Sequence, residues 1–352
     1  MKQEIIDKIN RLASQDEPFL FVINYQGDKA FIRQLSDINP EECLFDFEGR
    51  GNSSDEMKNN SEKIAEISWQ IAPPLYEDYE RSFDIVKNNI MAGNSYLTNL
   101  TCKVPVSCNL SLEDIFHRAK GKYKLLLRRK RNLNPFVCFS PETFVRIKNG
   151  RIYSYPMKGT LDASLPDAEK QLMEDRKEAA EHATIVDLIR NDLSRVAENV
   201  RVDKYRYIDV LHTNKGDILQ TSSEISGRLP EDYRQHLGEI LDAQLPAGSI
   251  TGAPKDKTMQ IIQEAEGYDR GFYTGIMGIY DQGELNSAVM IRFVEEEASP
   301  SKTEKGKNSE VSRELYFKAG GGITSKSDCR KEYEEVIQKI YLPIQENPSS
   351  EY

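Results

Sequence analysis

From about residue 76 onward, helical patterns alternate with pairs of strand-like segments, and this alternation restricts the fold more than any other feature of the sequence. Apolar residues recur at helical spacing over 79–93 and 167–197, whereas 136–157 and 273–295 are typical of strands joined by a short turn. Strands joined by short turns pair antiparallel, which disfavours a doubly wound parallel sheet. The sequence therefore predicts an α+β fold, and its 352 residues suffice for one large domain or two ordinary ones.

The first 75 residues differ from the rest of the chain in their pattern of apolar and polar residues. Short alternating runs at 19–25 and 29–35 are typical of strands, and a stretch rich in Gly, Asn and Ser at 48–63 precedes a Pro-Pro pair. We therefore expect a small β-rich N-terminal subregion over residues 1–75 and a larger core over residues 76–345.

Composition and charge exclude several classes of protein. The net charge of -10 argues against binding to nucleic acid or to an anionic membrane, both of which require clustered positive charge. No apolar run is long enough to span a bilayer, and the polar N-terminus does not resemble a signal peptide. The five cysteines and four histidines show no disulfide or zinc spacing. We expect a cytoplasmic protein with reduced thiols.

Two glycine-rich segments are candidates for binding an anion. The segment 245–255 leads into a helix, and a helix N-terminus favours negative charge. In 319–323, three glycines follow an apolar strand and leave backbone N–H groups open to a close ligand. A tight turn is the alternative for each, and neither has the spacing of a nucleotide-binding loop. The candidate residues are Gly248, Ser249, Thr251, Gly252, Gly320, Gly321 and Gly322.

Pairs of glutamates three residues apart occur in two of the predicted helices, at Glu178 and Glu181 and at Glu332 and Glu335. Residues at this spacing share one helix face, so each pair can direct two carboxylates at one spot. A small number of hard oxygen ligands, completed by water and an anionic substrate, is the usual way that proteins hold Mg²⁺. The alternative is a solvated helix face without a ligand.

Seven motifs, in this order, resemble those of the chorismate-utilising enzymes: SPETF, PMKGT, EHATIVDLIRNDLSRV, LPAGSITGAPK, YTGIMGIY, IRF and AGGGITSKSDCRKEYEE. The resemblance covers about residues 76–340. It implies the family fold, in which two orthogonally packed, mostly antiparallel sheets are flanked by helices. It also implies Mg²⁺ bound by Glu181, Glu332 and Glu335 together with the ring carboxylate of chorismate, and it leaves Glu178 on a solvated face.

Lys158 decides which branch of the family the chain resembles. The run Pro-Met-Lys-Gly-Thr at 156–160 is similar to the Pro-Ile-Lys-Gly-Thr of aminodeoxychorismate synthase component I. In anthranilate synthases the corresponding motif resembles Pro-Ile-Ala-Gly-Thr. This resemblance implies conversion of chorismate and ammonia to 4-amino-4-deoxychorismate, the precursor of 4-aminobenzoate in folate synthesis. Ammonia would come from a separate glutamine amidotransferase subunit, because no cysteine lies in a glutaminase-like nucleophile elbow.

The resemblance also implies roles for the site residues. Lys158 would attack ring carbon C2, and Glu142 would protonate the departing C4 hydroxyl and later accept a proton from the new amine. Arg292, which we expect to be buried in an apolar strand, would bind the enolpyruvyl carboxylate with Tyr273 nearby. Gln220 stands where related synthases have a histidine near the C4 hydroxyl, and it can form hydrogen bonds but cannot protonate.

Other interpretations remain open. Glu142 could be an exposed turn residue, and Arg292 could form a structural ion pair. The chain could instead be an anthranilate synthase component I, another chorismate enzyme or a non-catalytic chorismate-binding homologue. Enzymes that add water to chorismate are disfavoured, because the lysine they use is absent from the corresponding segment around Leu97 and Thr98.

Overall fold

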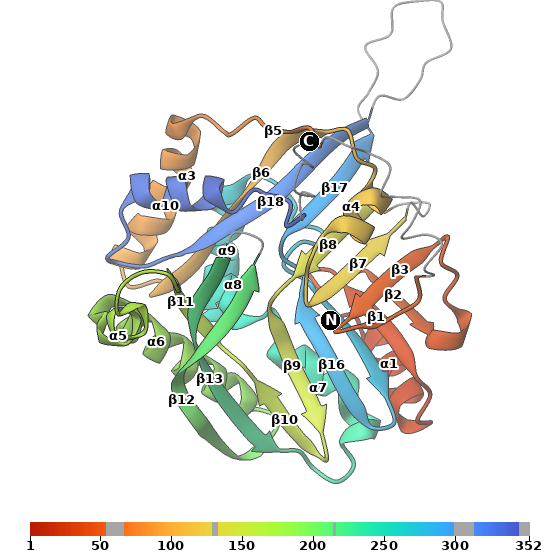
Figure 1. The fold of residues 1–352 in the computed structure, drawn as a ribbon. Coiled ribbons are helices and arrows are strands. Elements are labelled where there is room, and N and C mark those ends of the chain that lie inside the picture. Colours follow the sequence, from red (N-terminus) through yellow and green to blue (C-terminus); the bar gives the residue numbers. More distant parts are fainter. Residues whose placement is uncertain (54–66, 129–132, 214–215, 299–312, 345–352) are drawn as a thin grey trace, which may run out of the picture. The chain divides into compact units, whose positions relative to one another are not determined.

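Segments far apart in the sequence combine into two compact units (Figure 1). The structure is a computed structural model that describes residues 1–53, 67–128, 133–213, 216–298 and 313–344. Unit 1 consists of Met1–Asp37, Glu142–Thr258 and Arg270–Val289, and unit 2 consists of Ile38–Pro141, Met259–Asp269 and Met290–Tyr352.

An antiparallel sheet forms the centre of unit 1. Its order is β11 (Met157–Asp162), β13 (Gly216–Arg228), β10 (Arg151–Ser154), β9 (Thr143–Lys148), β16 (Glu284–Val289), β15 (Ile276–Asp281), β1 (Phe19–Ile23) and β2 (Ala30–Gln34), and β12 (Glu198–Thr213) also pairs with β13. The long strand β13 thus pairs with β10, β11 and β12. Three strands therefore take their register from β13.

The helical pattern over 167–197 forms two helices instead of one, α5 (Ala168–Glu174) and α6 (Arg176–Leu193). The chain breaks at Asp175, whose carboxylate accepts hydrogen bonds from the backbone N–H groups of Lys177 and Glu178 and so caps α6. The other helical segments of unit 1 are α1 (Gln3–Ser14), η1 (Leu35–Asp37), η2 (Tyr233–His236), α7 (Leu237–Gln244) and α8 (Gly248–Thr251), and the short strand β14 (Gly252–Ala253) follows α8.

Unit 2 contains the second antiparallel sheet. Its strands follow the order β6 (Leu97–Cys108), β18 (Arg313–Ile323), β17 (Phe293–Ala298), β8 (Phe136–Ser140), β7 (Tyr123–Leu127), β3 (Cys43–Phe47) and β4 (Arg50–Gly51), and β5 (Trp69–Ile71) pairs with β6. The helices α3 (Tyr76–Met91), α4 (Leu112–Arg118) and α10 (Cys329–Gln338) cover it, and α9 (Lys255–Glu266) ends in this unit. Phe83 of α3, Val336 of α10 and Phe317 of β18 meet in one buried apolar cluster.

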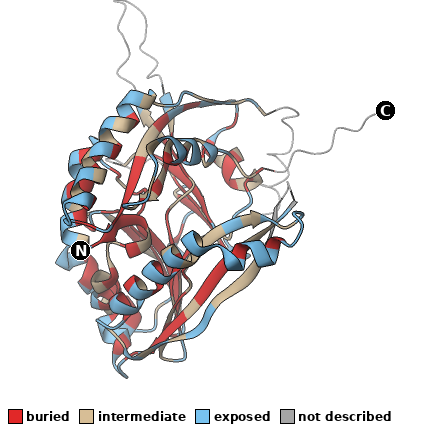
Figure 2. Ribbon diagram, turned by 90° about the vertical axis from the view of Figure 1, so that its left-hand side faces the viewer, coloured by how far each residue is buried: buried red, intermediate tan, exposed pale blue. Residues whose placement is uncertain are grey.

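The predicted fold class is confirmed, because the two sheets are antiparallel and carry helices. Figure 2 shows buried residues gathered along the strands, while exposed and buried positions alternate along the helices, as the helical periodicity predicts. Residues 1–75 contain β1 to β5, whose strands belong to both sheets. That these residues form a separate subregion stays a prediction.

The five cysteines are free. Within the residues that the structure describes, no helix is long and apolar enough to cross a membrane.

Candidate active site

Lys158 lies on β11, opposite Thr221 of β13, and its side chain is about one-third exposed. The strand pairing shifts register between Lys158 and Thr160, where Gly159 has a positive φ of 72°. A side chain at Gly159 would be strained, and its Cβ would lie 3.0 Å from Glu178 Oε2. The Gly in Pro-Met-Lys-Gly-Thr is therefore required by the bulge that follows the lysine.

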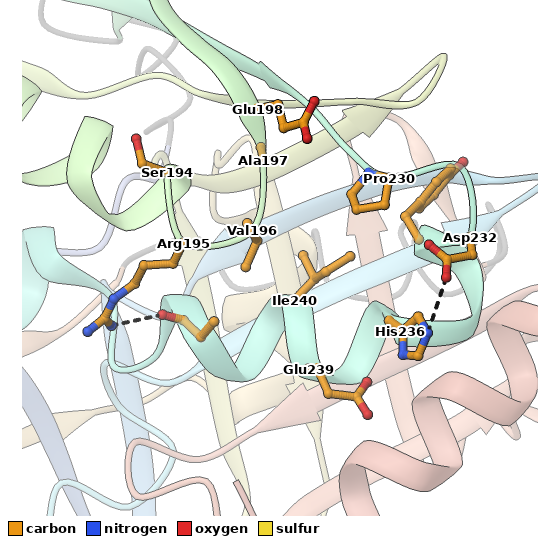
Figure 3. Close-up of a pocket in the computed structure, with 12 residues that line it drawn as sticks. Ser194, Arg195, Val196, Ala197, Glu198, Pro230, Asp232, His236, Glu239 and Ile240 are labelled. Atoms are coloured by element: carbon orange, nitrogen blue, oxygen red, sulfur yellow. Dashed lines mark hydrogen bonds and ion pairs between the residues drawn. The ribbon is translucent and has the colours of Figure 1, made fainter.

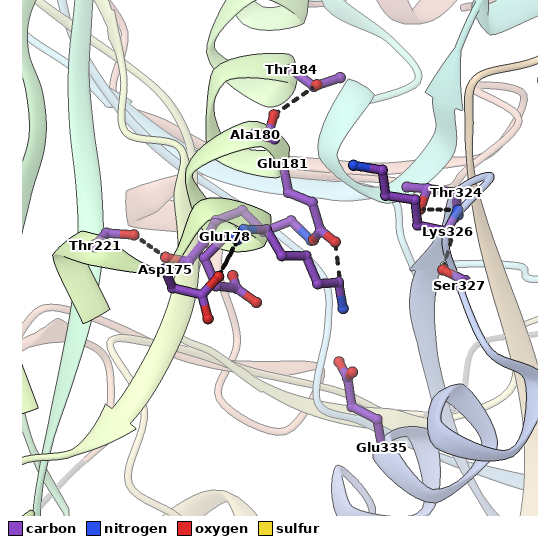
Figure 4. A network of polar contacts seen from close by, with 12 residues as sticks. Asp175, Glu178, Ala180, Glu181, Thr184, Thr221, Thr324, Lys326, Ser327 and Glu335 are labelled. Carbon is purple, nitrogen blue, oxygen red and sulfur yellow. Dashed lines mark hydrogen bonds and ion pairs between the residues drawn. The ribbon is translucent and has the colours of Figure 1, made fainter. Parts of the chain in front are cut away.

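The Lys158 ammonium group meets a carboxylate of α6. Lys158 Nζ donates a hydrogen bond to Glu181 Oε2 at 3.2 Å, and Lys177 Nζ lies 3.7 Å from Glu181 Oε1 (Figure 4). Glu178 projects from the same helix, and burial, followed by the neighbouring Glu181 charge, raises its pKa. The expectation that Glu178 lies on a solvated face is wrong, because it is half-buried beside the β11 bulge.

His182, which follows Glu181, joins α6 to β13. Its Nε2 lies 2.6 Å from Ser223 Oγ, and both residues are fully buried. Ser223 Oγ accepts a hydrogen bond from the Arg206 N–H, so its own proton is available to His182 Nε2. Burial lowers the pKa of His182 to about 4, with further lowering from Arg206 and Lys158. The motifs predict no role for His182, although its place beside Glu181 in the sequence is a usable signal.

Glu142 lies directly before β9, and its carboxylate is not that of a lone exposed turn residue. Ser249 Oγ of α8 donates a hydrogen bond of 2.6 Å to Glu142 Oε1. The Glu142 carbonyl accepts a hydrogen bond of 3.2 Å from the N–H of Val289. The predicted catalytic acid and a predicted substrate-binding serine are therefore direct partners.

Two of the other residues of unit 1 that are predicted to belong to the site have polar atoms without a hydrogen-bond partner. Among the described residues, Gln220 Oε1 and Thr251 Oγ1 are buried without a hydrogen-bond partner. Such atoms are rare in folded proteins and are usually satisfied by water or a ligand. Tyr273 is buried in the turn before β15, and Gly248 packs so closely that a Cβ would lie 2.8 Å from Leu188 Cδ2.

In unit 2, the three glycines belong to β18 and have different surroundings. A Cβ at Gly320 would lie 2.6 Å from the carbonyl oxygen of Leu100 in β6, so strand packing alone requires this glycine. A Cβ at Gly321 would have no neighbour closer than 3.7 Å, and those nearest atoms are Glu332 Oε2 and Lys339 Nζ. At Gly322, a Cβ would be 3.2 Å from Leu97 Cδ1. A methyl group at Gly321 would therefore be in ordinary van der Waals contact with the buried Glu332 carboxylate.

Arg292 is not in a strand, contrary to the prediction. It forms a half-buried bend with a positive φ of 54° between β16 and β17, because the chain passes there from one sheet to the other. Its guanidinium carbon lies 5.4 Å from the centre of the Tyr341 ring, and its carbonyl accepts a hydrogen bond from Phe139 N–H. Its role in binding a carboxylate stays a prediction.

The three predicted metal ligands are carboxylates, which suit Mg²⁺ by donor type. In the structure two of them accept from lysines, Glu181 from Lys158 and Glu335 from Lys339 at 2.7 Å. Among the described residues, no three acidic, histidine or cysteine side chains are grouped as metal ligands would be. The donor chemistry of the carboxylates fits Mg²⁺, which stays a prediction.

A cavity of about 460 Å³ opens elsewhere in unit 1, and no predicted site residue lines it (Figure 3). Its walls are Ser194, Arg195, Val196, Ala197, Glu198, Pro230, Asp232, Tyr233, His236, Glu239, Ile240 and Ala243. His236 and Asp232 pair across its rim at 3.5 Å. The unpartnered atoms of Gln220 and Thr251, as well as Lys158 and Glu142, lie on other segments, and a catalytic role of Lys158 and Glu142 stays a prediction.

Comparison with known proteins yields a consistent set of matches. A family model described as chorismate binding enzyme matches residues 19–345. A Haemophilus influenzae protein named "Uncharacterized PabA-like protein" is 46% identical over 343 residues, covering 97% of each chain. Aminodeoxychorismate synthase component 1 of Salmonella typhimurium is 30% identical over 275 residues, covering 75% of this chain and 56% of that protein. Anthranilate synthase component 1 of Aquifex aeolicus is 36% identical over 243 residues, covering 63% and 45%.

Solved structures agree on the fold. MenF, the menaquinone-specific isochorismate synthase of Escherichia coli, superposes with a TM-score of 0.67 at 15% identity, covering 96% of this chain and 80% of that one. At this identity the likeness concerns the fold alone.

The buried, neutral His182 predicts that acid destabilises the protein. Its pKa is 6.5 when unfolded and about 4 when folded, so the unfolded chain binds the proton first and stability is lost as the pH falls through this window. From about pH 7 to about pH 5, His182 should remove about 2 kcal/mol from the free energy of unfolding. Urea unfolding in the presence of chelator measures this, with His182→Gln as the control lacking the titration. Equal pH slopes for both proteins would contradict the assignment.

Proposed function

Because the chain belongs to the chorismate binding enzyme family, we propose that it replaces the C4 hydroxyl of chorismate with an amino group and forms 4-amino-4-deoxychorismate. One observation carries this proposal over anthranilate synthesis. In the corresponding motif of the anthranilate synthases, alanine stands at the position of Lys158. Lys158 Nζ donates a hydrogen bond to Glu181, a carboxylate that is predicted to lie beside the substrate. Similarity to aminodeoxychorismate synthase component 1 supports the proposal, although anthranilate synthases are similar too.

The proposed reaction is two allylic displacements. Lys158, in its neutral amine form, attacks C2, both ring double bonds shift by one position, and the C4 hydroxyl leaves as water with a proton from Glu142. Ammonia then attacks C4, both double bonds shift back and Lys158 departs as a neutral amine, while Glu142 takes a proton from the new C4 ammonium. Because C4 is trigonal in the intermediate, attack by ammonia on the face that the hydroxyl left gives net retention. Attack requires Lys158 Nζ to give up its hydrogen bond to Glu181.

We propose Mg²⁺ as the cofactor, with Glu181, Glu332 and Glu335 as its ligands. The ion would supply positive charge for the ring carboxylate of the substrate. The donor type of the three carboxylates supports this choice of residues, because Mg²⁺ prefers hard oxygen ligands.

The other substrate contacts are proposed from the unsatisfied atoms and from the resemblance. Gln220 Oε1 would accept a hydrogen bond from the C4 hydroxyl, and Thr251 Oγ1 would bind a carboxylate oxygen. Arg292 and Tyr273 would bind the enolpyruvyl carboxylate. Gln220 cannot donate a proton as a histidinium can, so Glu142 would supply the proton alone.

Purified chain supplied with chorismate, Mg²⁺ and ammonium salts at alkaline pH should yield a product that becomes 4-aminobenzoate only after a lyase is added. Glutamine should support no turnover until a glutamine amidotransferase subunit is also present. Chromatography of the products measures both outcomes. Fluorescent anthranilate, formed without a lyase, would contradict the proposal and favour the anthranilate synthase alternative. Absence of turnover under all conditions would favour a non-catalytic homologue.

Chelator should abolish turnover, and added Mg²⁺ should restore it. Glu335→Gln should lose about 100-fold or more in activity while it unfolds like the wild type, because it removes a charge from a half-exposed side chain and leaves no cavity. Its neighbour Glu334, which pairs with Arg330 on the surface, provides the matched control Glu334→Gln, with activity unchanged. Calorimetric titration with Mg²⁺ adds a readout apart from activity. Full turnover in excess chelator would exclude a magnesium site.

A further inference from the structure

The hydrogen bond between Ser249 and Glu142 joins residues 107 positions apart and is short, at 2.6 Å. We propose that Ser249 is a positioning residue that fixes which oxygen of Glu142 faces the departing hydroxyl, an inference that rests on the proposed acid role of Glu142. The sequence predicts that Ser249 contacts the substrate, but in the structure its hydroxyl donates to the Glu142 carboxylate.

A buried arginine fixes the serine. Ser249 lies in α8, and the carbonyl of the next residue, Ile250, accepts a hydrogen bond of 2.9 Å from Arg270 NH1. Arg270 is 2% exposed, and its guanidinium carbon lies 4.7 Å from the centre of the Tyr25 ring. A cation held between a carbonyl and an aromatic face leaves the α8 turn little freedom to move.

A second cation, Lys255, restrains the C-terminal end of the segment 244–255 that contains α8. Lys255 Nζ lies 2.9 Å from Asp192 Oδ2 of α6 and donates to the Gln244 carbonyl at 2.8 Å. The Gln244 side chain in turn donates to the Asp192 carbonyl at 2.9 Å. Both ends of 244–255 are therefore tied to the C-terminal part of α6, the helix that carries Glu181.

The backbone of Glu142 is fixed independently of the serine. Its carbonyl accepts from Val289, and the next residue, Thr143, pairs with Ala288 as β9 joins β16. The Glu142 carboxyl group nevertheless turns about a soft terminal torsion, which a fixed backbone does not restrain. Ser249, which lies on the restrained α8 turn, limits rotation about this torsion through its hydrogen bond to the carboxyl group.

The hydrogen bond has a chemical consequence. A hydroxyl donor prefers the oxygen of a carboxyl group that carries no proton, so Ser249 at Oε1 leaves the acidic proton on Oε2. General acid catalysis requires that proton within hydrogen-bond reach of the leaving oxygen. Ser249 therefore acts on the chemical step through Glu142 and contributes little to substrate binding.

Steady-state kinetics test whether Ser249 acts on the chemical step or on substrate binding. Ser249→Ala should lower kcat about tenfold or more, because the lost hydrogen bond is to a carboxyl group that becomes charged as its proton leaves, with KM changed less than about twofold. Ser249→Thr, which keeps the hydroxyl, should restore most of kcat. In a Glu142→Gln background, Ser249→Ala should have no further effect. A rise in KM with kcat unchanged, or additive losses in the double variant, would overturn the inference and return Ser249 to the substrate.

Crystal structures of the wild type and Ser249→Ala give a readout without turnover. The inference expects the Glu142 carboxyl group to rotate or adopt several orientations in the variant, while the α8 backbone stays in place. A Glu142 side chain with the same single orientation in both proteins would overturn it. If the wild type consumes no chorismate, the proposed function fails, whereas this structural comparison still decides the role of Ser249.

Discussion

The pairing of β13 with three other strands is the constraint on which the chemistry of unit 1 depends. Thr221 of β13 lies opposite Lys158 and donates to its carbonyl, and Gln220 lies opposite Thr160. Ser223, two residues after Thr221, is hydrogen-bonded to His182 and so joins β13 to α6. Because side chains alternate between the faces of a strand, a slip of one residue would turn these groups to the opposite face. Register therefore decides whether the lysine and its α6 carboxylate meet.

Most polar groups inside unit 1 have partners, and the exceptions are informative. Lys158 pairs with Glu181, Lys255 with Asp192, and Glu142 with Ser249. Buried polar atoms are costly when they are unsatisfied, so such pairing is the norm. The buried atoms without partners among the described residues include those of Gln220 and Thr251, both predicted to contact substrate. The unsatisfied atoms and the motif resemblance thus indicate the same segments.

The amino-acid sequence predicts the fold class correctly, because apolar periodicity is a local property, whereas the segments that its motifs assign to the site stay a prediction. It does not predict the break at Asp175, since capping competes with a continuous helical pattern there. The predictions that Glu178 lies on a solvated face and Arg292 in a strand are wrong, because burial beside a bulge and passage between sheets are set by tertiary pairing. The contact of Ser249 with Glu142 joins distant segments and has no local signal.

The central claim is that Lys158 bonds covalently to the ring, and mass spectrometry of the peptide that contains it tests this most directly. Enzyme incubated with chorismate and Mg²⁺ without ammonia should show a mass increase on that peptide, and Lys158→Ala should lose both the adduct and most of the amination. The matched variant Lys177→Ala, which removes the other lysine near Glu181, should keep the adduct. An unmodified wild-type peptide together with near-normal amination by Lys158→Ala would contradict the account and indicate direct amination.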